Sequence, residues 1–297
     1  MTGLIAGSIE AGFLLVLLLI PAFRRKKLVR AAVRASERSG LALTPAMLPV
    51  LIRRRRATWI GYALGSAIGF EATVLLQAGT HLLRGGIGGS FGFQGSWFFV
   101  GGLGALLGGV LGARSVRLEG PRVARGRAVT VADYVEPAER SLPWFTAAIA
   151  MVASLVPVLH GSGAVGLAPG AAAVATVGVS ALVARWIVSR PQRADSTVSL
   201  AWDDALRSGA VRNLFSGAVA IALVTLIVSV PTALTSFGLT ARSTDLQLWA
   251  SMGVCAVLLV LAILSERARP ARYFLRRLWP GTAAQLAEHE RPMEVQR

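Results

Sequence analysis

The sequence predicts an all-α fold, a polytopic membrane helix bundle of about seven transmembrane helices with the N-terminus outside and the C-terminus inside. Three observations support this prediction. Of the 297 residues, 54% are hydrophobic and only 15% are charged, whereas a soluble domain carries about 25% charged residues. The apolar residues fall in blocks of about 20, the length of a helix that crosses a bilayer. Basic residues gather between alternate blocks, as they do on the inner side of membrane proteins.

The first predicted span covers residues 3–23, and the basic residues 24–27 follow it. A cleavable signal peptide has the opposite order, with its basic residues before the apolar stretch. We therefore expect an uncleaved span that runs from the outside to the inside.

Residues 24–56 form a basic segment that contains only one acid, Glu37. Its first part has basic residues at helical spacing on one face and ends at Ser39-Gly40, which predicts an amphipathic helix on an anionic inner leaflet. Residues 41–52 are apolar but too short to span, and prolines interrupt them, so we expect an interfacial or re-entrant piece. The residues predicted to anchor the chain at the inner leaflet are Arg24, Arg25, Lys26, Lys27, Arg53, Arg54, Arg55 and Arg56.

The second span is predicted at residues 57–83 and the third at 97–113. The third span carries two rows of small residues at four-residue spacing, which let neighbouring helices approach closely in lipid. We therefore expect it to form the buried centre of the bundle. The string GLGALLG within it lacks the glycine spacing of a dinucleotide-binding loop. The glycines predicted to pack against other helices are Gly101, Gly104, Gly108, Gly109 and Gly112.

Four more spans follow, separated by two hydrophilic inner loops at residues 114–142 and 190–213. The spans are predicted at residues 143–160, 170–189, 214–234 and 246–264, within a bundle of residues 1–267 and before a basic tail of residues 268–297. With this threading, every Lys and Arg falls on the inner side except Arg84 and Arg242 in outer loops and Arg185, which lies near the inner end of the span at 170–189. The net charge of +16 therefore needs no nucleic acid partner to explain it.

The two inner loops contain similar strings, VTVADY at residues 129–134 and VSLAWD at residues 198–203. One interpretation is a duplicated span-loop-span unit, since many transport proteins contain repeats. The other is convergence of two inner loops in a chain of biased composition. In both loops the acids are expected to cap helices or to pair with arginines, in preference to binding a partner.

Glu10 and Glu71 lie within predicted spans, where an ionisable side chain costs about 2.5–3.5 kcal/mol on insertion scales. They form the candidate ion or proton site. The alternative is that each is protonated and hydrogen-bonded in a helix interface. No catalytic residue, metal site or cofactor is predicted, because the single cysteine, Cys255, lies in an apolar run and the histidines lack metal-ligand spacing.

The loop strings VTVADYVEP and SLAWDDALRS resemble those of an uncharacterised actinobacterial family of multi-pass integral membrane proteins. The resemblance covers spans three to six and implies a plasma-membrane location, with no assigned activity. Together these features predict a transport-associated membrane component that lacks its own ATPase and pairs with a separate cytoplasmic ATPase or with itself. The alternative is a non-transporting scaffold or sensor that binds partners through its basic inner loops. A membrane enzyme ranks last.

Overall fold

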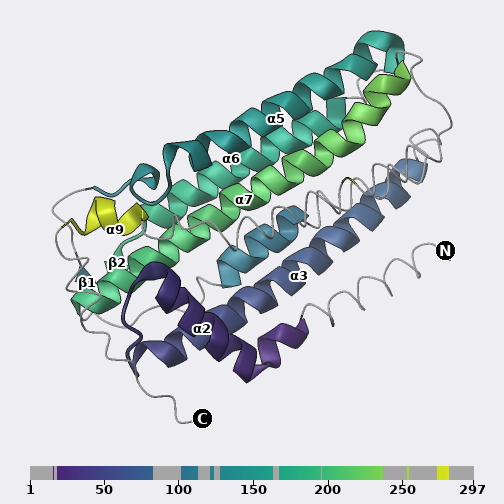
Figure 1. The fold of residues 1–297 in the computed structure, drawn as a ribbon. Helices are drawn as coiled ribbons and strands as arrows, with labels where there is room; N and C mark the ends of the chain where they lie inside the picture. The colour runs from purple at the N-terminus through teal and green to yellow at the C-terminus, as the bar shows by residue number, and fades with distance from the viewer. Residues whose placement is uncertain are drawn as a thin grey trace.

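The computed structural model describes residues 16, 19–82, 102–112, 121–123, 128–162, 167–194, 196–236, 253 and 273–280. These residues are predominantly helical, which confirms the all-α prediction for the described part. Three of the helices are long and apolar enough to cross a membrane, which indicates membrane association. Figure 1 shows the long helices side by side, with the short elements gathered at one end. The spans expected at 3–23 and 246–264 lie outside the described residues, except for 16, 19–23 and 253.

The three membrane-length helices pack against one another as a bundle. They are α5 (Pro137–Pro157), α6 (Ala168–Ser189) and α7 (Thr197–Ser236), and a π-helical turn (Val158–Ser162) extends α5. Small side chains fill their common core, which lets the helix axes come close. The outward faces carry exposed aliphatic and aromatic side chains, as expected for a surface in contact with lipid. The core residues are Ala147, Ala150, Ala173, Val177, Ala218 and Ala222.

Helix α7 differs from the sequence prediction, because it is one continuous helix of 40 residues. The hydrophilic loop expected at 190–213 is reduced to a short connection, and residues 197–213 form the first turns of the helix. Similarly, residues 137–142 of the other expected loop belong to α5. Both stretches are polar enough to resemble loops, but Ala201, Trp202 and Val211 are buried at helical spacing and hold the α7 extension in place.

Helices α2 (Arg25–Ser39) and α3 (Met47–Leu82) pack together beside this bundle. Helix α2 ends where the sequence predicts, because Gly40 adopts a left-handed conformation with φ of 64° and its N–H donates to the Ser36 carbonyl. Helix α3 begins earlier than expected and includes residues 47–52 of the piece predicted as interfacial, whereas residues 41–46 lie before the helix. Pro49 is compatible with this start, since an N–H in the first helical turn has no partner within the helix.

The helix Gly102–Gly112 packs backbone to backbone against α3. A Cβ atom added at Gly65 would overlap the carbonyl oxygen of Gly104, and one added at Gly61 would overlap that of Gly108. The glycines of α3 recur every four residues, like those of the other helix. Each helix therefore offers a flat strip to its neighbour, which is the arrangement that small-residue repeats favour in membranes.

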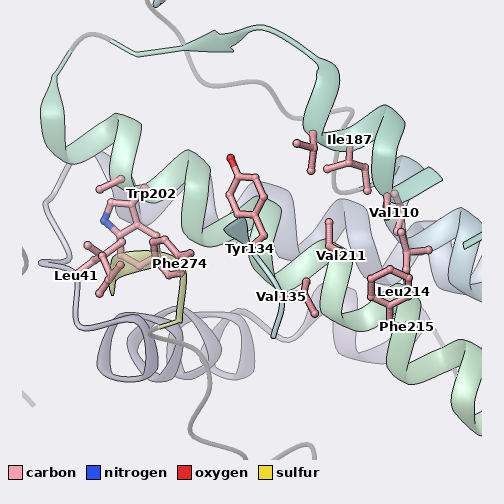
Figure 2. Close-up of a cluster of buried hydrophobic side chains, with 14 of the residues drawn as sticks. Leu41, Val110, Tyr134, Val135, Ile187, Trp202, Val211, Leu214, Phe215 and Phe274 are labelled. Carbon is pink, nitrogen blue, oxygen red and sulfur yellow. The ribbon is translucent and has the colours of Figure 1, made fainter. Parts of the chain in front are cut away.

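The short elements build a compact polar end of the bundle, which we call the head and define as residues 25–54, 121–123, 128–136, 190–194, 196–207 and 273–280. It contains the 3-10 turn Val131–Asp133, the antiparallel strand pair β1 (Arg122–Val123) and β2 (Gln192–Arg193) at its edge, and the short helix α9 (Tyr273–Leu278). Figure 2 shows its apolar core, in which Leu41, Trp202 and Phe274 lie together near Tyr134. All four of these side chains are fully buried.

The two similar strings of the inner loops adopt different local structures. Residues 131–133 form the 3-10 turn ahead of α5, whereas residues 198–203 lie in the first turns of α7. The similarity of sequence is therefore not matched by a similarity of backbone. This difference favours convergence over duplication at these two strings.

Candidate functional site

A buried carboxylate, Asp204, lies at the centre of the head. Its side chain has no exposed surface. Oδ1 accepts hydrogen bonds from Tyr134 Oη at 2.8 Å and from Gln192 Nε2 at 2.7 Å, and Oδ2 accepts one from Trp279 Nε1 at 3.0 Å. The three donors come from the segment before α5, from β2 and from the segment after α9. One carboxylate thus joins four parts of the chain, and we call these residues together with Asp203 and Arg207 the polar hub.

Arg207 connects the start of α7 to the end of α6. Its Nη1 donates to the carbonyl oxygens of Val188 at 3.2 Å and Arg190 at 2.8 Å, and its Nε donates to Asp203 Oδ2 at 2.7 Å. The last carbonyls of a helix have no partner within the helix, and a guanidinium can satisfy several of them. Arg207 is therefore the cap of α6, supplied by the next helix.

The two acids of the polar hub lie beside arginines. Asp203 and Asp204 lie near two buried arginines, Arg207 and Arg54. Burial lowers the pKa of Arg54 to about 10, while the attraction of Asp203 acts in the opposite direction and the repulsion of Arg207 acts in the same direction. The Arg54 guanidinium remains protonated at neutral pH, so two carboxylates face two guanidinium groups.

Other contacts fasten the edges of the head. Trp202 Nε1 donates to the Ala42 carbonyl at 2.9 Å, and Ser208 Oγ donates to the Tyr134 carbonyl at 2.9 Å. Arg212 of α7 lies 3.3 Å from Glu139 of α5, and the exposed Arg276 lies 3.5 Å from Glu136. These contacts span long sequence separations, so the head forms only when the whole bundle has assembled.

The hub is built to hold its neighbours in position. Its carboxylates accept hydrogen bonds from defined donors, and its arginines are used by helix ends and acids. In the described part of the chain, no three His, Cys, Asp or Glu side chains lie close enough to hold a metal ion. The arrangement gives the head a fixed shape and buries its acids, so its outer surface is left to the exposed basic side chains.

The structure places the predicted basic anchors in two different environments. Arg24, Arg25, Lys26, Lys27, Arg53, Arg55 and Arg56 are exposed. Arg54 is the exception, because only 9% of it is exposed and it faces the hub. Arg54 differs from the other seven because a helix turns successive residues of an RRRR run to different sides. The anchoring of the chain at the leaflet stays a prediction.

The predicted packing glycines and acids are placed as follows. Gly104, Gly108 and Gly112 face the backbone of α3, Gly109 faces the ring of Tyr62, and Gly101 lies outside the described residues. Glu71 is half-buried in α3, and Glu10 lies outside the described residues. The ion or proton site formed by these two acids therefore stays a prediction.

The polar hub was not predicted from the sequence, although part of its signal is visible there. Asp203 and Arg207 are four residues apart, the spacing of an ion pair on a helix. The partners of Asp204 are Tyr134, 70 residues away, and Trp279, 75 residues away. No local pattern connects such distant residues.

Comparison with protein-family models, with curated proteins and with solved structures finds no significant match to this chain. The function proposed below is therefore inferred from the residues and their geometry.

Proposed function

We propose that this chain is a multi-pass plasma-membrane protein of seven spans with its head in the cytoplasm, and that the head docks an acidic cytoplasmic protein. The contrast between the inside and the outside of the head supports this proposal. Inside, the two acids of the polar hub lie near Arg207 and Arg54. Outside, the exposed charges of α2 are basic with one exception, Glu37. The exposed basic residues of α2 are Arg25, Lys26, Lys27, Arg30, Arg34 and Arg38.

The packing of α2 favours a protein partner for this basic face. An amphipathic helix that binds a leaflet inserts its apolar face among the lipids. In α2 the apolar face is not available to insert among lipids, because Leu28, Ala32 and Ser36 are buried against the protein. What remains is a row of cations on a supported helix, a surface that attracts and orients an acidic partner. The described part of α2 carries no aromatic side chain on which nucleic acid bases could stack.

The identity of the partner decides between the two functional classes. A cytoplasmic ATPase would make the chain the membrane component of a transport assembly, consistent with the absence of a phosphate-binding loop from its sequence. A partner without ATPase activity would make it a scaffold. In both cases the docking face is the same.

Co-purification of the tagged full-length chain in a mild detergent, with mass spectrometry of the bound proteins, tests the proposal. We expect one acidic cytoplasmic protein at stoichiometric amount with the wild type. Arg30→Gln combined with Arg34→Gln should reduce its recovery about tenfold, because each lost charge weakens the attraction.

Arg193→Gln combined with Arg277→Gln is the matched control, since it removes the same charge from two other exposed sites of the head. The control should retain the partner. Equal loss from both double variants, or no stoichiometric partner with the wild type, would show that α2 is not a specific docking face.

A further inference from the structure

We infer that a collar of arginine and aromatic side chains surrounds the bundle where the head begins, and that it binds the phosphate groups of anionic phospholipids. The collar comes from three long helices, from Arg190 directly after α6 and from Phe23, two residues before α2. It consists of Phe23, Arg55, Arg56, Trp59, Arg140, Trp144, Trp186 and Arg190.

The end of α6 shows the repeating unit of the collar. The guanidinium carbon of Arg190 lies 3.8 Å from the ring centre of Trp186, close enough for a strong cation–π contact. Leu182 lies one turn further from the head and is 64% exposed. Along one face of this helix the order is therefore a cation, an aromatic ring and an exposed aliphatic side chain.

The start of α3 carries the same three kinds of side chain, although not all on one face. Arg56 lies over the ring of Phe23 at 4.8 Å, and Arg55 lies over the ring of Trp59 at 5.9 Å. Further along the same helix, Leu64 is 50% exposed and Ile68 is 69% exposed. The cations of α3 thus lie on the head side of an exposed apolar surface.

Helix α5 gives a third instance from its exposure pattern alone. Arg140 and Trp144 are both exposed and are one turn apart. Val152 lies two turns further along the same face and is 63% exposed.

The shared order of arginine and ring in the three helices does not follow from the direction of the chain. Helices α3 and α5 run away from the head, whereas α6 runs toward it. In all three, the arginine lies on the head side of the ring. Sequence order alone would not give the same polarity in helices of opposite direction, so a common external boundary explains it best.

Contacts with α7 place the three sites along one stretch of that helix. The Arg190 carbonyl bonds to Arg207, Glu139 beside Arg140 pairs with Arg212, and Arg54 beside Arg55 is close to Asp203. The α7 residues in these contacts span about 14 Å along the helix axis. Long arginine side chains can reach one headgroup layer from this range.

The chemistry of the collar identifies its ligand. A guanidinium presents a fork of donors that matches phosphate oxygens, and tryptophan prefers the level of the headgroups. The exposed aliphatic residues beyond the rings would contact acyl chains. A ligand that has both a phosphate and acyl chains satisfies all three layers, so we assign the collar to phospholipids of the adjoining leaflet.

The experiment titrates phosphatidylglycerol and, separately, phosphatidylcholine into the detergent-solubilised full-length chain and counts retained lipids by native mass spectrometry. We expect the wild type to retain phosphatidylglycerol preferentially. Arg55→Gln combined with Arg190→Gln should weaken this retention about tenfold, because each arginine near the surface contributes measurably to lipid attraction.

Arg30→Gln combined with Arg34→Gln removes the same charge from α2 and should leave retention unchanged. Equal weakening by the two double variants would overturn the collar, since net charge alone would then explain binding. Displacement of the lipid by soluble glycerol phosphate at equal concentration would also overturn it, because the site would then recognise a free anion. Arg55→Lys combined with Arg190→Lys, which keeps the charge and removes the guanidinium fork, should retain phosphatidylglycerol less well than the wild type.

This inference is independent of the docking proposal. Loss of lipid in the collar variant with the protein partner retained would support the collar alone. Loss of the protein partner in the α2 variant with lipid retained would support docking alone.

Discussion

The side chain of Arg207 connects several parts of the protein. It is 4% exposed, and its donors reach the last carbonyls of α6 and the carboxylate of Asp203. Removing one partner of a buried ion pair leaves an uncompensated charge, which costs about 3–5 kcal/mol. The free carbonyls of α6 add to that cost.

We expect Arg207→Met to lower the melting temperature of the detergent-solubilised protein by about 10 °C, because a bundle of this size loses about 2–4 °C per kcal/mol. Arg34→Met, at an exposed site of α2, should change it by less than about 2 °C. Fluorescence-detected size-exclusion chromatography after heating measures both. Equal melting temperatures for the two variants would mean that the α6 cap contributes nothing to stability.

Residues in the hub mark the limit of sequence-based prediction. Asp203 could be expected to pair with an arginine, because Arg207 lies one turn away. Asp204 could not be assigned its partners, since Tyr134 and Trp279 meet it only through tertiary packing. Arg54 was grouped with its neighbours by composition, and only the direction of its side chain distinguishes it.

At the scale of the elements, the contact between α3 and the helix Gly102–Gly112 depends on glycines, which have no side chain to separate the two backbones. An added methyl group at Gly65 would overlap a backbone carbonyl of the other helix, which cannot move aside as a flexible side chain can. Overpacking of this kind costs about 1–3 kcal/mol.

Gly65→Ala should therefore lower the melting temperature by about 3–10 °C. Gly209→Ala is the matched control, because nothing lies within 4 Å of a Cβ placed there. It should raise stability by about 0.5–1 kcal/mol, since alanine is the better helix former. If Gly65→Ala is as stable as Gly209→Ala, the two helices do not need their close approach.

Element boundaries were predicted well where local chemistry sets them and poorly where packing does. Gly40 ends α2 through its own backbone conformation, so the stop was visible in the sequence. The start of α7 lies well before the expected span, because Trp202 and Ala201 are buried by distant segments. Polar residues 197–213 looked like a loop for the same reason, since their partners lie outside the local sequence.

For the whole molecule, the membrane topology is defined by which helix ends lie on the same side of the membrane. Helix α6 has 22 residues and is about 33 Å long, close to the thickness of the hydrocarbon core. The head lies at its C-terminal end, and the far end of α5 carries the exposed His160. If α5 and α6 cross fully, these two regions face opposite compartments.

Single-cysteine labelling in intact cells tests this arrangement in a Cys255→Ala background. With the head inside, a membrane-impermeant maleimide should label His160→Cys, and it should label Arg193→Cys only after the cells are permeabilised. Arg277→Cys should behave like Arg193→Cys, because α9 belongs to the head. Labelling of His160→Cys and Arg193→Cys under the same condition would mean that α6 does not cross.

The unbroken course of α7 gives the molecule a mechanical property. Its 40 residues extend for about 60 Å, and one end is clamped within the head while the other reaches the far end of the bundle in Figure 1. A continuous helix of this length has no joint between its ends, so a few degrees of tilt imposed on the head would displace the far end by several ångströms. If α7 crosses the membrane, a force applied to the head would reach the other side without any chemical relay.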